Sequence, residues 1–340
     1  MKKALVVAAF VFVSAFVFAG QFKHNFAWDW TMPHDAKFFD EVKRLGFNNF
    51  VTSEAGATLD KIFEEAGKRD IKVYLVMGFK AGGVFPDGSE QSISAADTKN
   101  VIRKAKLGKD PNDQVGGEPL DPNDVNRDDF VCFNNADALK AGVENIRNLA
   151  AEKRAAGIAF DWFGFKNYYA CFCDNCVEKE AVYAKAHPEL KAEEALYKFS
   201  EESLLNFMNT LIAEGRKARP DIKFTCHVYP YFKPEPLYGN KLNIEYPEQT
   251  VSWFFLPHWD LKKVRDYTKI VVKGAKKYYK DGVGIPFMGI SSDKNMKSAA
   301  RIADEFKILT EEGAEGVSVA CIGDILKDPE MAKVFEEKLK

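Results

Sequence analysis

The sequence has little net charge and lacks a second long apolar run. Its 48 lysines and arginines nearly balance its 50 aspartates and glutamates, and the formal net charge is −2. Proteins that hold nucleic acid or an anionic membrane surface by charge carry a basic excess. After the N-terminal segment, no apolar stretch reaches the roughly 20 residues that a membrane-spanning helix needs. We therefore expect no nucleic-acid partner and no membrane anchor in the mature chain.

Two short motifs are missing as well, and cysteine is sparse. No glycine-rich phosphate-binding turn follows the first predicted strand, as it does in dinucleotide-binding open sheets. No His-x-His pair follows that strand, which argues against a hydrolase with a catalytic metal there. Six cysteines in 340 residues do not make a small disulfide scaffold. Each cysteine therefore needs its own explanation.

The N-terminal residues are typical of a secretory signal peptide. Lys2 and Lys3 precede an uncharged apolar stretch that closes with VFA at 17–19, which fits a small-residue cleavage rule. We expect residues 1–19 to be removed and residues 20–340 to form the mature domain, in the periplasm or outside the cell. An uncleaved N-terminal anchor is the alternative, although the run is short for a span.

Strand-sized apolar runs alternate with helix-period segments along the rest of the chain. Strands are predicted at 24–32, 48–56, 71–79, 157–165, 222–232, 249–259, 284–291 and 316–324. Helices are predicted at 35–46, 58–70, 136–157, 177–217, 261–282, 295–316 and 328–340, with a short Pro-rich connection after the fifth strand. Eight such units predict a single-domain (β/α)8 TIM barrel, and a doubly wound open sheet is the alternative.

One long insertion, residues 80–135, separates the third strand from its helix. Its central stretch, 110–129, is rich in Asp, Asn, Pro and Gly. A Ca²⁺ loop is conceivable from these oxygen ligands, but the glycine and glutamate spacing of an EF-hand is missing. We expect a solvated loop over the barrel mouth, since loops of this length usually serve function.

The active site of a TIM barrel lies at the C-terminal ends of its strands. All five tryptophans of the chain fall at these predicted ends, where their rings suit the faces of sugars. The alternative role of these tryptophans is to fill the top of the barrel as part of its hydrophobic core. The histidines there are candidate donors to sugar hydroxyls. The predicted substrate-binding residues are Trp28, Asp29, Trp30, Glu54, Trp162, His227, Tyr229, Trp253, His258, Trp259 and Asp293.

Carboxylates at the same ends are candidates for catalysis, because glycoside hydrolysis uses two carboxylates that flank the scissile bond. Asp161 follows the fourth strand directly, and we predict it to be the nucleophile or general base; its apolar neighbours would disfavour its charged form. Capping of the next turn is its alternative role. Asp260 is the first choice for the acid, and it is equally suited to cap the helix that follows it. Glu54, Asp293 and Asp29 are the next choices.

Four cysteines are expected to converge at this face of the barrel. Cys171, Cys173 and Cys176 form C-x-C-x2-C just beyond the fourth strand, and Cys132 lies before the helix that leads into that strand. Four thiolates suit a tetrahedral structural Zn²⁺ site. Two disulfides are the alternative in an oxidising compartment. The two other cysteines fall within predicted strands and are expected to be buried.

This cysteine pattern resembles that of the family 42 β-galactosidases and related glycoside-hydrolase-like barrels. The resemblance implies a structural zinc beside the active site, bound by Cys132, Cys171, Cys173 and Cys176. The catalytic positions differ. Where that family has an Asn-Glu pair after strand 4 and a nucleophilic Glu after strand 7, this chain has FDW (160–162) and GISSD (289–293). A strand 4 Asp with a strand 6 Asp resembles instead the arrangement of the α-galactosidase clan.

These observations predict a glycoside hydrolase that acts on an oligo- or polysaccharide through paired carboxylates at the barrel mouth. A barrel that binds carbohydrate without catalysis is the alternative, and the missing strand 7 Glu favours it.

Overall fold

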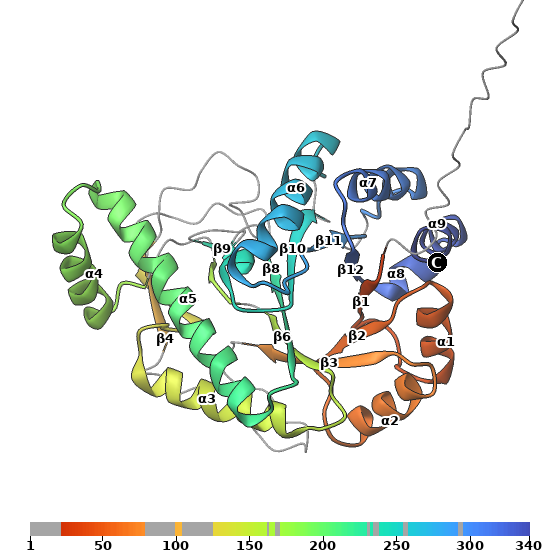
Figure 1. Cartoon of the computed structure of the whole chain (residues 1–340), viewed down its shortest axis with the longest axis horizontal. Coiled ribbons are helices and arrows are strands. Elements are labelled where there is room, and N and C mark those ends of the chain that lie inside the picture. The colour runs from red at the N-terminus through yellow and green to blue at the C-terminus, as the bar shows by residue number, and fades with distance from the viewer. Residues whose placement is uncertain are drawn as a thin grey trace, which may run out of the picture.

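The computed structural model describes residues 22–78, 99–103, 125–161, 163–166, 171–229, 232–233, 238–253, 258–291 and 295–340. The predicted signal peptide, residues 1–19, lies outside them. Eight parallel strands close into a barrel in the order β1-β12-β11-β10-β8-β6-β3-β2, with the helices outside (Figure 1). The predicted (β/α)8 TIM barrel is thereby confirmed.

The barrel strands each overlap one predicted strand. They are β1 (His24–Trp28), β2 (Asn49–Thr52), β3 (Lys72–Gly78), β6 (Gly157–Asp161), β8 (Lys223–Val228), β10 (Tyr246–Ser252), β11 (Ile285–Gly289) and β12 (Gly316–Ala320). The sixth strand, β10, begins and ends earlier than predicted. Its inward positions carry polar residues such as Glu248. The apolar run used to predict the strand therefore begins several residues after the strand itself does. The tryptophans that follow belong to the next loop.

The helices alternate with these strands. They are α1 (Ala36–Arg44), α2 (Gly56–Gly67), α3 (Ala136–Ala151), α4 (Asp174–Ala186), α5 (Ala192–Ala218), α6 (Leu261–Tyr278), α7 (Ala299–Glu311), α8 (Ile322–Leu326) and α9 (Pro329–Leu339). The predicted helical region at 177–217 is two helices, interrupted around Pro188 as expected. A 3-10 helix, η3 (Tyr238–Lys241), follows the fifth barrel strand. Among the described residues, no helix is both long and apolar enough to cross a membrane.

Two small antiparallel sheets lie beside the barrel. The described part of the long insertion contains one of them, formed by β4 (Lys99–Arg103) and β5 (Val125–Val131). The predicted mouth-covering loop at 110–129 falls mostly outside the described residues. The second sheet pairs β7 (Phe165–Lys166), just beyond β6, with β9 (Phe232–Lys233), just beyond β8. It therefore joins two loops at the C-terminal face of the barrel.

Aromatic side chains fill the lower part of the barrel. Phe26 contacts Tyr74 and Tyr246, with ring centroids 5.1 and 5.3 Å apart. Gly157 makes room for this layer, because a Cβ there would lie 2.2 Å from Tyr74 Cε1. A second core lies between the strands and the helices, and the two remaining cysteines, Cys226 and Cys321, are buried as expected. This aromatic layer packs inside the barrel below its C-terminal mouth.

Candidate active site

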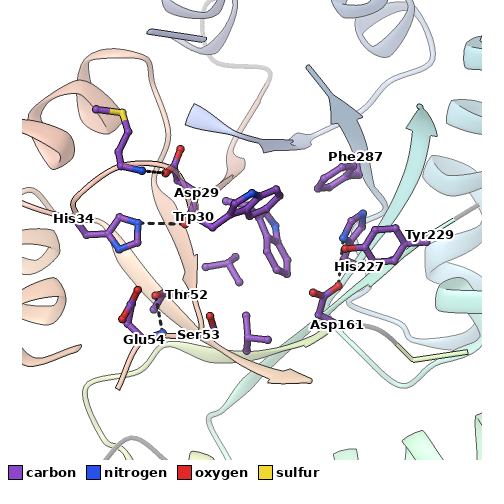
Figure 2. A pocket seen from close by; sticks show the side chains of 14 residues that line it. Asp29, Trp30, His34, Thr52, Ser53, Glu54, Asp161, His227, Tyr229 and Phe287 are labelled. Atoms are coloured by element: carbon purple, nitrogen blue, oxygen red, sulfur yellow. Dashed lines mark hydrogen bonds and ion pairs between the residues drawn. The ribbon is translucent and has the colours of Figure 1, made fainter. Parts of the chain in front are cut away.

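A cavity of about 390 Å³ opens at the C-terminal mouth of the barrel. Six of the eight strands contribute a residue to its lining, which gives Trp28, Thr52, Val76, Asp161, His227 and Phe287. This is the face where TIM barrels carry their active sites. Figure 2 shows Asp161, His227, Tyr229 and Phe287 on one side of the cavity, with His34 and Glu54 on the other.

Asp161 enters the cavity because of strand alternation. Along β6, Ile158 and Phe160 face outward into the core beneath the helices, and Ala159 belongs to the barrel interior. Asp161 is two residues beyond Ala159 and therefore faces inward at the mouth. It is only 8% exposed, and its Oδ1 has no hydrogen-bond partner among the described residues. A buried carboxylate oxygen that makes no full hydrogen bond can still accept one from a ligand.

His227 on β8 lies beside this carboxylate. Its Nδ1 is 3.5 Å from Asp161 Oδ1, and its Nε2 is 3.4 Å from Thr250 Oγ1. The ring stacks on Phe287 with centroids 3.8 Å apart and contacts Tyr229 at 4.2 Å. The imidazole is thus held on both faces and by both nitrogens. It orients the carboxylate rather than moving freely in the cavity.

Trp28 forms the floor of the cavity and is anchored by an acid that the sequence analysis missed. Its indole Nε1 donates to Glu248 Oε2 at 2.9 Å, and the hydroxyls of Thr225 and Ser318 donate to the same carboxyl. Glu248 is fully buried. Burial raises the pKa of Glu248, against the lowering effect of the three donors. An acid at an inward position of a strand is the signal that could have revealed this residue.

Asp29 has a supporting role. Its Oδ1 accepts from the backbone N–H groups of Thr31 and Met32 at 2.7 and 2.9 Å, and its Oδ2 accepts from Gly323 N at 2.6 Å. These bonds tie the turn after β1 to the start of α8. The carboxylate lines the cavity but its oxygens already have donors, so it shapes the mouth through the loop that it holds.

Two predicted residues lie at the rim. Trp30 is 67% exposed, and Glu54 is exposed beyond the end of β2; both line the cavity. His34 lines the same side and was not predicted. Its Nε2 lies 3.2 Å from Asp29 O, and its ring contacts Phe50 at 5.0 Å. No periodicity places a residue within an irregular turn, which is why the sequence did not indicate His34.

Four predicted site residues do not line this cavity. Trp253 and Trp259 are buried in a separate cluster under α6 and α7, and Trp253 packs edge-on against Tyr229 at 6.2 Å. Asp260 is exposed and caps α6, accepting from Lys263 N at 2.7 Å. This is the capping role that its sequence position left open. His258 precedes this cap. Trp162 and Asp293 lie outside the described residues.

A buried ion network fixes the chain around His258. Lys297 Nζ donates to Ser252 Oγ at 2.5 Å and lies 3.4 Å from Glu305 Oε2. Arg301 Nε also pairs with Glu305, at 2.7 Å, and its other end donates to Trp259 O. Burial lowers the pKa of Lys297 to about 8, partly opposed by Glu305. Burial and the same two cations lower the pKa of His258.

The four predicted cysteines converge beside β6. The sulfurs of Cys132, Cys171, Cys173 and Cys176 all lie within 4.8 Å of one another, and no cysteine of the chain forms a disulfide. Cys132 Sγ is 3.3 Å from Cys176 Sγ and 3.8 Å from Cys173 Sγ. A tetrahedral Zn²⁺ with Zn–S bonds of ~2.3 Å separates its sulfurs by about 3.8 Å. The cluster could therefore hold a metal ion.

Comparisons with known proteins agree with the fold. No protein-family model matches the sequence, and a search of curated proteins gives no significant match. Among solved structures, the chain is similar to the PgaB (BpsB) glycoside hydrolase domain from Bordetella bronchiseptica, with a TM-score of 0.61 and 9% identity over 93% of this chain and 99% of that one.

A GH42 β-galactosidase from G. stearothermophilus, a catalytic mutant, gives a TM-score of 0.61 with 11% identity, over 94% of this chain and 56% of that one. α-L-Fucosidase isoenzyme 2 from Paenibacillus thiaminolyticus gives a TM-score of 0.56 with 11% identity, over 93% of this chain and 48% of that one. The chain spans about half the length of these two enzymes. It has a glycoside-hydrolase-like (β/α)8 barrel, as the resemblance to family 42 implied, and at this identity the likeness shows the fold alone.

Proposed function

We propose that the protein is a glycoside hydrolase of the periplasm or the extracellular space, acting on an oligo- or polysaccharide. The observation that carries the proposal is Asp161, a buried carboxylate beside His227 that faces a cavity at the C-terminal mouth of the barrel. The cavity volume falls within the range of small-molecule sites. The three structural neighbours named above are glycoside hydrolases and support the same reaction class.

The walls of the cavity suit a sugar. Trp28 and Phe287 offer aromatic surface, and Trp30 at the rim presents a ring that is 67% exposed. Sugar rings have apolar faces and polar edges, so aromatic stacking together with a few fixed polar groups holds them. Glu54 and His34 supply polar groups on the side opposite Asp161 (Figure 2). We therefore place substrate between the two sides.

Asp161 is proposed as the nucleophile or general base. His227 holds one carboxylate oxygen in place, and the stacked Phe287 and Tyr229 keep the imidazole from turning. Asp161 can then attack the anomeric carbon, or accept a proton from water that attacks it. The second carboxylate is sought among the other predicted acids, which are Asp260 at the α6 cap, Asp293, and the two acids that line the cavity, Glu54 and Asp29.

A structural zinc at the four cysteines is part of the proposal. The donor set is four thiols, and the spacing of Cys132 from Cys173 matches a tetrahedral edge. Cys173 also forms the N-cap of α4, so the metal would join α4 to the segment before α3. Held together, these segments support the loop beyond Asp161. The ion would take no part in the reaction.

The proposal is tested by a screen of glycan hydrolysis with the wild type, followed by variants. Asp161→Asn is expected to lower kcat by about 10²–10⁴-fold, the usual contribution of a proton-transferring group. Asp260→Asn and Asp293→Asn test the partner in the same way. Asp221→Asn is the matched control, because this exposed aspartate precedes β8 at the opposite end of the barrel.

Two outcomes would contradict the assignment. Unchanged hydrolysis by Asp161→Asn would remove Asp161 from the reaction. Glycan binding by the wild type without hydrolysis of any glycan would favour the alternative, a carbohydrate-binding barrel without catalysis. Zinc content and a free-thiol count on the secreted protein decide the cysteine question: about one Zn per chain supports the metal, and two disulfides without metal contradict it.

A further inference from the structure

The imidazole of His227 lies between two oxygen atoms, so the hydrogens on its ring determine how it acts on Asp161. Its Nδ1 is 3.5 Å from Asp161 Oδ1 (Figure 2), and its Nε2 is 3.4 Å from Thr250 Oγ1. All three side chains are buried. A neutral imidazole carries one hydrogen, on either nitrogen, and an imidazolium carries both. Which nitrogen is protonated follows from the hydrogen bond that the other one makes.

The hydroxyl of Thr250 has one hydrogen and two acceptors within reach. It donates to the carbonyl oxygen of Val228 at 3.0 Å, which is nearer than His227 Nε2. The hydroxyl oxygen therefore presents a lone pair, and not its hydrogen, to the ring. Because Nε2 can contact that lone pair favourably only as a donor, the first hydrogen of His227 lies on Nε2.

This placement leaves Nδ1 without a hydrogen when the ring is neutral. A bare nitrogen and a carboxylate oxygen both present lone pairs, so the contact between His227 and Asp161 would then be repulsive. The contact becomes attractive when Nδ1 binds a proton, because an imidazolium donates a charge-assisted hydrogen bond to a carboxylate. Asp161 is therefore held by the doubly protonated ring and not by the neutral one.

The aromatic rings around His227 favour its charged form. Phe287 stacks on the imidazole with centroids 3.8 Å apart, and Tyr229 and Trp28 lie at 4.2 and 5.6 Å. Aromatic faces attract a cation, which places the proton of the pair on the imidazole rather than on the carboxyl. Glu248 on β10 is the register partner of His227 and the further acid beside it. Burial raises the pKa of Glu248, and the charge of His227 is among the effects that oppose this rise.

We propose that Thr250 keeps a hydrogen on His227 Nε2, so that His227 holds the Asp161 carboxylate only as an imidazolium. Thr250 is thus a positioning residue that acts on Asp161 through the ring. Asp161 is ionised in this pair, which suits a nucleophile or general base and not a general acid. As pH rises, Nδ1 gives its proton to water and the attraction is lost. The inference rests on the proposed function only for its consequence in catalysis.

Nitrogen-15 NMR of the histidine side chains in the full mature chain tests the inference without substrate, because each ring nitrogen reports separately whether it is protonated. His227→Gln identifies the signals of His227 among the five histidines. Wild type is expected to carry both hydrogens at acid pH and only the Nε2 hydrogen at alkaline pH. In Asp161→Asn, Nδ1 should lose its hydrogen at a lower pH than in wild type, because the carboxylate that stabilises the charge is gone.

Substitutions of Thr250 assign the effect to its hydroxyl. Thr250→Val removes the acceptor for Nε2, so the hydrogen should move to Nδ1 at alkaline pH, whereas Thr250→Ser should keep the wild-type tautomer. Thr268→Val is the matched control and should leave the ring of His227 unchanged. Thr268 on α6 is equally buried, and its hydroxyl donates to Val264 O at 2.7 Å. If Thr250→Val does not fold, an Nδ1 hydrogen at alkaline pH in Thr250→Ser overturns the inference.

Kinetics on the best glycan found with wild type connect the ring to catalysis. We expect kcat/KM to fall on the alkaline side at the pH at which Nδ1 loses its hydrogen in the spectra. Thr250→Val should lower kcat/KM by about two- to tenfold below that pH, the effect of one lost hydrogen bond. It should not show the same alkaline fall, because its neutral ring still donates to Asp161. Thr250→Ser should follow the wild-type profile.

Four results would overturn the inference: a wild-type ring with its hydrogen on Nδ1 at alkaline pH, a wild-type ring with a bare Nδ1 at acid pH, a Thr250→Val ring that keeps its hydrogen on Nε2, or an alkaline fall in kcat/KM that persists unchanged in Thr250→Val. The proposed function fails separately. A wild type that cleaves no glycan would remove the hydrolase and leave the spectra to decide the pair. Loss of turnover in Asp161→Asn with an Nδ1 hydrogen in alkaline wild type would keep the hydrolase and remove the role of Thr250.

Discussion

The carboxyl of Glu248 gives the sharpest test of how the cavity floor is held. It lies at the centre of the barrel with no exposed surface, and it accepts hydrogen bonds from Trp28, Thr225 and Ser318. Two of these donors have a second acceptor within reach. Trp28 Nε1 is 3.1 Å from Ser318 Oγ, and Thr225 Oγ1 is 2.6 Å from Tyr246 O.

The cost of a substitution follows from these contacts. Glu248→Gln keeps the volume and one acceptor oxygen, and the alternative acceptors limit the loss to about 1–2 kcal/mol of unfolding free energy. Glu248→Ala removes both oxygens and leaves a cavity, which predicts a loss of about 3–5 kcal/mol. In that variant Trp28 also loses its principal anchor, so substrate binding at the cavity floor should weaken.

The stability difference between wild type and Glu248→Gln should change with pH in a definite direction. Burial raises the pKa of Glu248 above its ordinary 4.5, so the neutral carboxyl is the form that the fold favours. The stability that this preference contributes is fully present below pH ~4.5 and is lost as pH rises through the folded-state pKa. A glutamine does not titrate. The stability advantage of wild type over Glu248→Gln should therefore shrink as pH is raised from about 4.5 towards 7.

Urea unfolding followed by circular dichroism at several pH values measures this difference, and tryptophan emission of the native state reports on Trp28. Two results would refute the reasoning: a wild-type advantage over Glu248→Gln that grows with pH, or a Glu248→Ala variant as stable as wild type. Equal m-values across the series are the control that all variants unfold between comparable states.

Three further predictions concern the surroundings of the site. The folded-state pKa of Lys297 is about 8, below its ordinary value of 10.5. The unfolding free energy of wild type should therefore rise by up to about 3 kcal/mol between those two pH values. Urea titrations should show less of this rise in Lys297→Met. A chelator should lower the melting temperature of wild type, whereas Cys132→Ser should start lower and not respond; a wild type indifferent to chelation would contradict the zinc. Gly323→Ala places a Cβ 2.3 Å from Thr31 Oγ1, in the turn that Asp29 holds, and should cost about 1–3 kcal/mol and weaken glycan binding measured by titration.

The barrel and its best candidate residue were predictable from the sequence for a local reason. The run that forms β6 is apolar throughout until Asp161, and alternation then decides which side that carboxylate faces. The cysteine motif is equally local, because three of its four cysteines lie within six residues. In both cases the information needed is contained in neighbouring positions of the chain.

The other half of the site depends on contacts between distant segments. The inward face of β10 is polar, so the hydrophobic pattern placed the strand too late and left Glu248 unnoticed. The same pattern suggested that Trp253 and Trp259 face the mouth, where in fact they pack under α6 and α7. His34 reaches the cavity from an irregular turn. Such placements follow from how loops pack, which periodicity does not describe.

The most direct measurement of the central claim is the turnover of Asp161→Asn on the best glycan found with wild type, compared with Asp221→Asn. Asp161 is the buried carboxylate that faces the cavity beside His227, and the control aspartate lies at the other end of the barrel. We predict that kcat falls at least about a hundredfold in the first variant and stays unchanged in the second. A kcat of Asp161→Asn within about twofold of wild type would contradict the account, since a group that transfers a proton or attacks the substrate contributes far more.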